Sequence, residues 1–455
     1  MPHLHWLYRM FSERVAQTFM ISDDEPFRYE WLLGHIAVCE RALSEAGITP
    51  GTVVAIRGDY TPYVVAALLA LVDRGAICVP LSPSVGVQES EFCHIAEVQI
   101  SVSPDSTGIG RVERYSRVPS NELTRRLIEQ QHPGLVLFTS GSTGKSKAAL
   151  HDFTKLLKKF EAPRKAMVTL AFLMIDHIGG INTLFSVLSN GGTVIASAER
   201  DPDVICALIE RHKVELLPTS PTFLNLLLMS ESYRHHDLTS LKLMTYGTEL
   251  MPQSTLERIR AIFPHARLQQ TYGLSELGIL RSKSESSDSL WVQIGGEGFE
   301  TKVEDGTLHI RAQSAMLGYL NAPSPFDADG WFDTQDLIYT NGEFVRFLGR
   351  RSEIINVGGN KVYPAEVENV LLQMSNVEDA TVVGAANPIT GRMVVAQVKL
   401  KEPEEPAEFR KRVREFCQGR LERFKTPSKI QIVNGSQFNS RFKKIRQLVV
   451  AEESQ

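Results

Sequence analysis

The sequence lacks the features that mark several large classes of protein. Its 49 lysines and arginines are fewer than its 53 aspartates and glutamates, so it has no basic excess of the kind that general nucleic-acid binders carry. The longest apolar stretch, residues 63–72, is much shorter than the ~20 residues that a membrane-spanning helix needs. The five cysteines show no metal-ligand or disulfide-framework spacing, and the start of the sequence lacks the apolar core of a secretory signal. We therefore expect a cytoplasmic protein with no membrane span and no nucleic-acid partner.

Two long stretches instead alternate helical patterns with short apolar runs, over residues 27–80 and 135–273. This alternation is typical of α/β units in which helices cover a parallel sheet. The expected strands are VVAI (53–56), ICVPL (77–81), LVLF (135–138), GTVIA (192–196) and VELLP (214–218).

The character of the sequence changes after Arg281. Asp305-Gly306 and Asn341-Gly342 each stand between two strand-like runs, which is the strongest short signal for a β-hairpin. We therefore expect a compact, distorted β-barrel over about residues 291–350.

A smaller α+β pattern follows, with a helix opening at Pro364 and a basic amphipathic helix over residues 408–424. The sequence thus predicts a large N-terminal portion over residues 1–350, with two parallel-sheet αβ subdomains and the barrel, and a small α+β C-terminal domain over residues 351–455.

A loop rich in glycine and hydroxyl side chains follows the expected strand at 135–138. Glycines let the main chain approach a phosphate, and consecutive N–H groups form an anion nest. The Walker A loop is one alternative, because Gly144-Lys145-Ser146 fits its end, but its first glycine is replaced by Thr139 and no strand ending in a metal-binding aspartate follows. A flexible polar turn is the other. The expected phosphate-binding residues are Thr139, Ser140, Gly141, Ser142, Thr143, Gly144 and Lys147.

This loop resembles the phosphate-binding loop of the adenylate-forming (AMP-binding) superfamily, which includes acyl-CoA synthetases and stand-alone adenylation enzymes. That family shows a Ser/Thr-Gly-Ser/Thr-Thr-Gly-x-Pro-Lys pattern, in which Ser146 here replaces the proline and Lys147 falls at the lysine. The resemblance implies a catalytic role for Lys147. It extends over four further motifs, from about Phe27 to Arg446, and implies the family's fold with a mobile C-terminal domain.

The segment QQTYGLSELG (269–278) is similar to the family's Tyr-Gly-x-Thr-Glu motif. The resemblance places Tyr272 near the adenine and Ser275 on a phosphate, with Thr271 and Gly273 beside them. Glu276 would hold Mg²⁺, since a carboxylate beside a triphosphate needs a divalent cation between them. Gly247, in YGTEL (246–250), stands in the family's adenine-wall segment, although an ordinary strand-end turn is nearly as good an interpretation.

Residues 330–350 resemble the Tyr-x-Thr-Gly-Asp segment and the Gly-Arg that follows it. Asp336 would accept both ribose hydroxyls with its paired oxygens, and Arg350 would lie near the ribose and phosphate. Gln335 replaces the family glycine, which is tolerable if that position needs no positive φ.

Residues 350–368 are similar almost residue by residue to the start of the family's C-terminal domain. The resemblance implies a hinge at Ser352, about which this domain rotates after adenylation. Gly358 and Gly359 would then line the pantetheine tunnel, where absent side chains leave room for a narrow ligand.

The family's C-terminal adenylation lysine is the main departure. In FKTPSKIQIVNGSQFNSRFKKIRQ (424–447), Arg441 falls at the lysine in the best register, and Lys443 reaches the site if the loop is shifted. Either cation stabilises a transferring phosphate, Arg through bidentate contacts. The alternative is that Arg441, Lys443 and Lys444 form a solvated basic tail.

The segment FLMIDHIGGINTLF (172–185) carries the substrate information. His177 falls at the carboxylate end of the acid pocket in the family, although a core histidine is the alternative. Ile178 stands where enzymes for α-amino acids hold an aspartate, and an unpaired buried ammonium is strongly penalised. The sequence favours a fatty, branched or aryl acid without an α-amino group, and the neighbouring Asp176 weakens that argument.

The predicted function is an ATP- and Mg²⁺-dependent acid–thiol ligase that makes an acyl-adenylate. The acyl group then passes to CoA or to the phosphopantetheine of a carrier protein acting in trans, which Gly358 and Gly359 cannot tell apart. The alternative, suggested by the departures at Ser146, Gln335 and Arg441, is a catalytically impaired nucleotide- or acyl-binding homologue. Oxygenation of the adenylate, as in luciferases, has no support beyond the shared fold.

Overall fold

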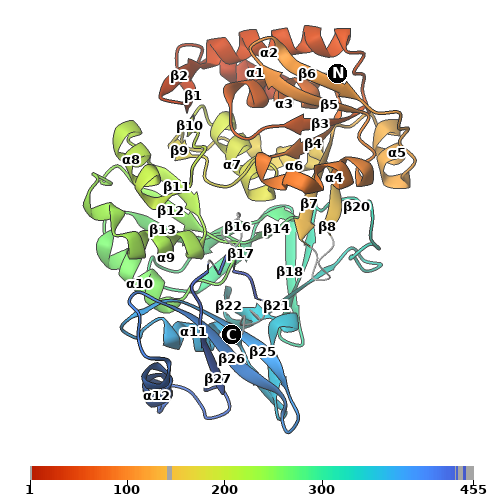
Figure 1. Cartoon of the computed structure of the whole chain (residues 1–455). Coiled ribbons are helices and arrows are strands. Elements are labelled where there is room, and N and C mark those ends of the chain that lie inside the picture. Colours follow the sequence, from red (N-terminus) through yellow and green to blue (C-terminus); the bar gives the residue numbers. More distant parts are fainter. Residues whose placement is uncertain (1–2, 141–145, 436, 439–443, 447–455) are drawn as a thin grey trace.

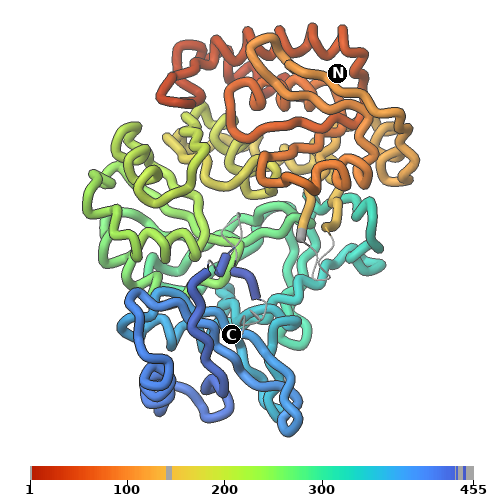
Figure 2. Tube along the Cα trace, viewed as in Figure 1, coloured from red at the N-terminus to blue at the C-terminus, as the bar shows by residue number. Residues whose placement is uncertain are grey.

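The computed structural model describes residues 3–140, 146–435, 437–438 and 444–446 of the chain. Two αβ units, an antiparallel sheet and a small α+β unit follow one another along the chain (Figure 1). The colours of Figure 2 trace the same path, from the first αβ unit in red and orange to the small unit in blue. The fold class is therefore the predicted one: an α/β portion with one mixed and one largely parallel sheet and a curled antiparallel sheet, followed by an α+β unit. The antiparallel strands β6 and β8 of the mixed sheet were not predicted.

The first αβ unit contains a seven-stranded sheet in the order β20-β8-β7-β4-β3-β5-β6. Its central helix, α3 (Pro62–Asp73), is buried on nearly every side. The helix begins with a proline, and the hydroxyl of the preceding Thr61 caps it by accepting the N–H of Val64 at 3.1 Å. The strands are β3 (Val53–Arg57), β4 (Ile77–Leu81), β5 (Ile100–Asp105), β6 (Gly108–Arg114), β7 (Gly134–Ser140), β8 (Ser146–Asp152) and β20 (Gly318–Tyr319). The helices of this part of the chain are α2 (Tyr29–Glu45), α3 (Pro62–Asp73), η1 (Pro83–Gln88), α4 (Glu89–Ile95), α5 (Glu122–Glu129), α6 (Phe153–Leu157) and η2 (Lys158–Phe160).

The second αβ unit contains a seven-stranded sheet in the order β13-β12-β11-β9-β10-β1-β2, parallel except for β2. Its strands are β1 (Thr18–Ser22), β2 (Glu25–Arg28), β9 (Val168–Leu170), β10 (Thr193–Ile195), β11 (Leu216–Thr219), β12 (Leu243–Tyr246) and β13 (Arg267–Gln270). Its helices are α7 (Ile178–Ser189), α8 (Pro202–His212), α9 (Pro221–Ser230), η3 (Ser232–Arg234) and α10 (Gln253–Ile262), and α1 (His5–Ser12) precedes β1.

The two αβ units exchange strands, which corrects the predicted division at residue 135. Strand β7, predicted to open the second unit, pairs with β4 of the first through Gly134 and Ile77. Strand β1, which precedes the first unit, pairs with β10 of the second through Met20 and Val194. An apolar run identifies a strand but not its partner, so the sequence pattern could not show this exchange.

The antiparallel sheet has the order β16-β17-β22-β21-β19-β18 and begins at Arg281, before the predicted start at 291. Both predicted hairpins are confirmed. Asp305 and Gly306 adopt φ of 49° and 74° between β18 and β19, as a type I′ turn requires, and Gly342 adopts 58° between β21 and β22. The strands are β16 (Arg281–Ser284), β17 (Val292–Gly295), β18 (Phe299–Glu304), β19 (Thr307–Ala312), β21 (Phe332–Asn341) and β22 (Phe344–Arg350), with β14 (Gly273–Leu274) and β15 (Gly278–Ile279) before them.

The small unit packs two helices on a mixed sheet in which β26 lies between β25 and β27. The predicted helix over 408–424 is wrong in its length, because α12 ends at Cys417 and Gly419 then adopts a φ of 77°. The predicted domain boundary lies where β22 meets η4, and it stays a prediction. The elements are η4 (Arg351–Glu353), β23 (Ile355–Val357), β24 (Asn360–Val362), α11 (Pro364–Leu371), β25 (Val377–Asn387), β26 (Gly391–Leu400), α12 (Pro406–Cys417) and β27 (Lys429–Ile432).

All five cysteines are buried free thiols. No helix among the described residues has the length and apolar character to cross a membrane.

Candidate active site

A cleft of about 1040 Å³ lies between the large portion and the small unit. Thr219, Gly247 and Thr271, at or just after the carboxyl ends of β11, β12 and β13, line one side of it. The first αβ unit contributes Thr139 at the end of β7. Ligands of open α/β sheets bind at this edge, so the fold places a ligand site where the sequence motifs converge.

The predicted phosphate loop joins two antiparallel strands, β7 and β8. Thr139 pairs with Lys147 and Ser140 pairs with Ser146, and both Thr139 and Ser146 line the cleft. The loop therefore begins and ends next to residues that line the cleft. The predicted residues Gly141, Ser142, Thr143 and Gly144 lie outside the described residues, as does the side chain of Ser140.

Lys147 and Glu276 meet at a third side chain, Tyr319 of β20. The Lys147 Nζ lies 5.0 Å from the centre of the Tyr319 ring, and the Tyr319 hydroxyl donates to Oε1 of Glu276. Strand β20 brings Tyr319 there by pairing with β8 through Ala149. No motif in the sequence pointed to Tyr319, because its position depends on a strand that joins the sheet from far along the chain.

Asn321 was also missed by the sequence motifs. Its side-chain amide donates to the carbonyl of Ser146 and accepts the N–H of Ala148, both at 2.9 Å. These two bonds hold the first residues of β8, directly after the phosphate loop. Asn321 thus fixes the main chain on either side of Lys147.

Glu276 is the one predicted metal ligand. Among the described residues no group of three or more histidines, cysteines, aspartates or glutamates is placed to hold a metal ion. A single carboxylate nevertheless fits Mg²⁺ at a nucleotide site, because this ion is held mainly by phosphates and water with one or two protein carboxylates.

The predicted nucleoside residues form one connected group. The Tyr272 hydroxyl donates to Oδ2 of Asp336 at 2.7 Å, and Nε of Arg350 donates to Oδ1 at 3.3 Å. The Tyr272 ring stacks on Phe347 with centroids 4.6 Å apart. Burial raises the pKa of Asp336, although the charge of Arg350 and the Tyr272 hydroxyl act against it. Phe347 is a cleft residue that the sequence motifs did not identify.

Close packing explains the glycine at 247. A Cβ there would lie 2.6 Å from Oγ1 and 2.8 Å from the carbonyl oxygen of Thr271, so any side chain would push β12 and the 271–276 segment apart. Thr271, Gly273 and Ser275 all line the cleft, as the motif predicted.

Gln335 replaces the family glycine, which is tolerable only if this position needs no positive φ. It adopts a φ of 60°, in the left-handed region that favours glycine. The condition is therefore not met, and the residue before Asp336 is strained.

The acid-side residues lie at the start of α7. His177 caps this helix by accepting the Gly179 N–H on Nδ1 at 3.2 Å, and both His177 and Ile178 line the cleft. Asp176 is buried and accepts the N–H and hydroxyl of Ser82 at 3.3 and 2.7 Å. It is not among the cleft-lining residues, which removes the objection that it could pair with a substrate ammonium.

The predicted residues of the small unit lie apart from one another. Gly358 and Gly359 form an exposed turn between β23 and β24 and do not line the cleft. Ser352 is exposed in η4, next to Glu353, which does line the cleft. The predicted hinge residue Ser352 thus lies next to a cleft-lining residue, whereas Gly358 and Gly359 lie outside the cleft lining.

Arg441 and Lys443 lie outside the described residues, but the chain on both sides of them is described. Phe438 and Lys444 form an antiparallel bridge and both line the cleft. The side chain of Lys444 is only 16% exposed and pairs with Asp379 at 3.0 Å, so the alternative of a solvated basic tail is wrong for Lys444.

These features together point to one family. Its AMP-binding enzyme profile matches residues 9–320, and the profile of the AMP-binding enzyme C-terminal domain matches residues 366–443. The chain belongs to the AMP-binding enzyme family. The resemblance to the adenylate-forming superfamily is thereby confirmed.

Curated relatives of the AMP-binding chain are named as CoA ligases, in agreement with the predicted acid–thiol ligase class. Indoleacetate–CoA ligase from Aromatoleum aromaticum is 26% identical over 93% of both chains. Feruloyl-CoA synthase from Amycolatopsis sp. is also 26% identical, over 81% of this chain and 83% of its own.

Solved structures share the fold. The anthranilate CoA ligase AuaEII, in complex with anthranoyl-AMP, has a TM-score of 0.80 at 17% identity and covers 98% of this chain and 96% of its own. ATP-bound MatB from Rhodopseudomonas palustris has a TM-score of 0.77 at 22% identity over 97% of both chains.

Proposed function

We propose that this protein uses ATP to convert a carboxylic acid into an acyl-adenylate and then transfers the acyl group to the thiol of CoA. One observation carries the proposal. Glu276, Tyr272, Asp336 and Arg350 line one cleft together with the acid-side residues of α7, and Lys147 lies behind Glu276, connected to it through Tyr319.

The proposed roles follow from the chemistry of each group. Asp336 accepts the ribose hydroxyls, and Arg350 supplies charge beside the ribose and phosphate. Lys147 and Ser275 bind the phosphates, and Glu276 holds Mg²⁺, which would neutralise part of their charge. His177 stands at the carboxylate end of the acid pocket.

The acid's carboxylate oxygen attacks the α-phosphorus, an acyl–phosphate bond forms, and pyrophosphate leaves. The thiol, with loss of its proton, then attacks the acyl carbon and AMP leaves. For this second step we propose that the small unit, residues 351–455, rotates about Ser352. The rotation brings Gly358 and Gly359 to the cleft, since both lie outside its lining in the present arrangement.

We propose that Arg441 or Lys443 stabilises the transferring phosphate. Lys444 and Arg446, the cations that follow, are engaged by Asp379 and Glu368 within the small unit, so they are less suited to bind a ligand. Neutralising the true residue should slow adenylation by roughly 100-fold, as loss of one preorganised donor does elsewhere. Acid-dependent exchange of labelled pyrophosphate into ATP by Arg441→Ala and Lys443→Ala separates the two, and full exchange in both variants would contradict the assignment.

We further propose an acid without an α-amino group. Ile178 stands where enzymes for α-amino acids hold an aspartate, and the neighbouring Asp176 is hydrogen-bonded to Ser82. Two relatives are named for indoleacetate and ferulate. Indoleacetate, anthranilate, ferulate and 4-coumarate, joined by fatty and branched acids, form a suitable panel for the test.

The deciding experiment incubates the protein with ATP, Mg²⁺, the acid panel and either CoA or a phosphopantetheinylated carrier protein. Mass spectrometry should show an acyl-CoA. Acylation of the carrier alone would move the acceptor to a carrier protein. A folded sample without pyrophosphate exchange on any acid would favour a non-catalytic nucleotide- or acyl-binding homologue, to which the strain at Gln335 also points.

A further inference from the structure

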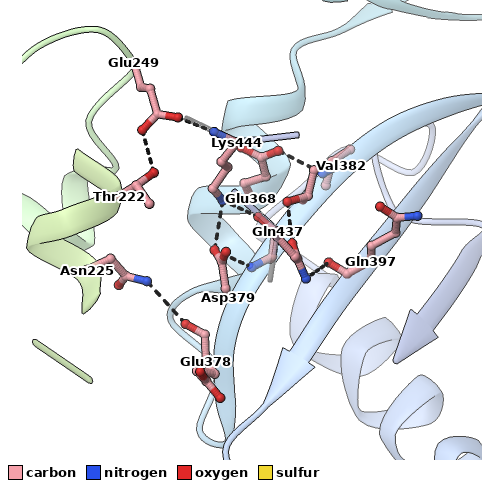
Figure 3. A network of polar contacts seen from close by, with 12 residues as sticks. Thr222, Asn225, Glu249, Glu368, Glu378, Asp379, Val382, Gln397, Gln437 and Lys444 are labelled. Carbon is pink, nitrogen blue, oxygen red and sulfur yellow. Dashed lines mark hydrogen bonds and ion pairs between the residues drawn. The ribbon is translucent and has the colours of Figure 1, made fainter. Parts of the chain in front are cut away.

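The small unit touches the large portion within the lining of the cleft, and part of this contact runs through Glu249, just after β12 (Figure 3). One carboxylate oxygen of Glu249 accepts the main-chain N–H of Lys444 at 2.5 Å. The other accepts the hydroxyl of Thr222, in the first turn of α9, also at 2.5 Å. Glu249 therefore joins three segments: the end of β12, helix α9 and the small unit at Lys444.

Helix α9 makes a second contact with the small unit. The Asn225 side-chain amide donates to the carbonyl of Glu378 at 3.4 Å, beside Asp379, to which the Lys444 ammonium is paired. Thr222 and Asn225 are three residues apart and so lie on one face of the helix. One face of α9 thus reaches the same corner of the small unit in two ways, directly through Asn225 and indirectly through Thr222 and Glu249 (Figure 3).

The contact at Glu249 depends on the position of the main chain rather than on the side chain of residue 444. A carboxylate that accepts a main-chain N–H is a charge-assisted hydrogen bond, stronger than a neutral one. It forms only while this part of the small unit stands next to β12. The side chain of Lys444 meanwhile points into the small unit, toward Asp379 and the carbonyl of Ala380.

We infer that Glu249 is a positioning residue that holds the small unit in place for adenylation and releases it before thioester formation. The inference rests on the proposed function. Lys444 directly follows Lys443 in the chain, so the bond from Glu249 fixes one end of the segment with the candidate cations at the cleft. Gly358 and Gly359, proposed for the thiol step, lie outside the cleft in this arrangement. Glu249 consequently favours the first half-reaction and has no role in the second.

The test compares Glu249→Leu, which keeps the approximate size but has no acceptor, with Glu249→Gln, which keeps an acceptor oxygen. Glu257→Leu, at an exposed glutamate of α10, controls for loss of a nearby negative charge. Each variant is assayed for pyrophosphate exchange, with the panel acid that the wild type activates fastest, and for thioester formation from the preformed acyl-adenylate and CoA.

Glu249→Leu should slow pyrophosphate exchange by roughly 10- to 100-fold, the effect of losing a hydrogen bond to a charged group. It should leave thioester formation unchanged. Glu257→Leu should exchange like the wild type, and Glu249→Gln, which keeps a weaker neutral hydrogen bond, should exchange faster than Glu249→Leu but more slowly than the wild type. Equal slowing of both half-reactions by Glu249→Leu would overturn the inference, as would normal exchange in that variant or exchange in Glu249→Gln no faster than in Glu249→Leu.

A readout without substrate keeps this inference separate from the proposed function. Trypsin cleavage at Arg351, in the exposed turn between the large portion and the small unit, should be faster in Glu249→Leu than in the wild type and Glu249→Gln. A wild type without any acid-dependent exchange would contradict the proposed function. Equal cleavage rates in all variants would contradict the positioning role of Glu249.

Discussion

Asp336 shows how a single residue combines burial with a binding task. Its side chain is only 14% exposed, and its two oxygens are held by the Tyr272 hydroxyl and the Arg350 guanidinium. Burial disfavours the charged form and raises the pKa of Asp336. The ribose contact proposed for Asp336 needs the ionised carboxylate, since only that form accepts through both oxygens without a competing proton.

We predict that ATP binding weakens as the pH falls and that the decline begins above the pH at which an ordinary aspartate protonates. Because its pKa is raised, Asp336 binds a proton at a higher pH than an ordinary aspartate does, and the protonated carboxyl is a poorer acceptor for the ribose hydroxyls. Isothermal titration with ATP between neutral pH and pH ~5 measures this. Asp336→Asn should bind about tenfold more weakly at neutral pH and show a flatter pH profile. An unchanged profile in that variant would assign the pH dependence to another group.

At the scale of an element, strand β21 carries a strained residue directly before Asp336. The left-handed conformation of Gln335, with a φ of 60°, costs about 1–2 kcal/mol of stability. Gln335→Gly should raise the free energy of unfolding by about 0.5 kcal/mol, because the strain relieved exceeds the ~0.5–1 kcal/mol of added unfolded-chain entropy. Chemical denaturation measures the change.

Two comparisons make the Gln335 prediction specific. Gln335→Val should lower the free energy of unfolding by about 1 kcal/mol or more, because β-branched residues tolerate this region least. Gln293→Gly, in β17 at a position without positive φ, should also be destabilising. If Gln335→Gly destabilised the protein as much as Gln293→Gly, the strain argument would be wrong.

Strand β8 carries Lys147 and depends on the amide of Asn321. Asn321→Ala removes the bonds to the Ser146 carbonyl and the Ala148 N–H, and so loosens the main chain on both sides of Lys147. We expect pyrophosphate exchange to slow by up to about 30-fold, since the two lost hydrogen bonds are worth about 1 kcal/mol each.

Asn376 offers a matched control for Asn321. Its side-chain amide makes the same double contact with the main chain of Glu402, within the small unit and away from the cleft. Asn376→Ala should therefore leave exchange intact. An equal loss of exchange in both variants would mean that general loosening, rather than the position of β8, causes the effect.

The limits of sequence-based prediction also appear at this scale. Apolar runs identified β3 and β4 nearly to the residue and β11 to within two residues, and Asp305-Gly306 identified a hairpin, because periodicity and turn chemistry are local properties. Tyr319 and Asn321 were missed, because they contact the cleft residues Glu276 and Ser146 only through the pairing of β20 with β8, which no local pattern encodes. Motif residues such as Asp336 and Arg350 were found by resemblance, and their contact follows from cross-strand pairing of β21 and β22.

At the scale of the whole molecule, the small unit contains a largely buried ion pair whose two residues, Glu368 and Arg446, line the cleft. Both oxygens of Glu368 accept from the Arg446 guanidinium, one of them at 3.1 Å, and Oε1 also accepts the Val382 N–H at 2.8 Å. Burial alone would raise the pKa of Glu368, but the charges of Arg446 and Lys444 and these hydrogen bonds outweigh it and lower the pKa.

We predict that the small unit loses stability in acid before the rest of the molecule. A carboxyl whose pKa is lowered by folding stabilises the folded state at every pH above its ordinary pKa. This contribution is lost as the pH falls from the ordinary pKa to the lowered pKa of the folded state. Hydrogen exchange of α11 and β25 should therefore accelerate below pH ~4.5, relative to α3 in the first αβ unit.

Glu368→Gln tests the origin of this acid sensitivity. The variant should lower the free energy of unfolding of the small unit by about 3 kcal/mol at neutral pH, because Arg446 loses its buried partner. It should also flatten the pH dependence below neutrality. Glu408→Gln, at an exposed glutamate of α12, should change neither. An undiminished acid response in Glu368→Gln would assign it to other carboxyls.

The strand exchange between the αβ units has a consequence for how the chain is made. Strand β1 leaves the ribosome early, but its parallel partner β10 follows only after about 170 further residues, roughly 10–30 s later at typical rates of synthesis. Until then the apolar segment Phe19–Ile21 has no native neighbour on that side, and the growing chain exposes an open strand edge. Chaperones that bind extended apolar segments would therefore find a target in Phe19–Ile21, and a fragment that ends before Thr193 could not complete its second sheet.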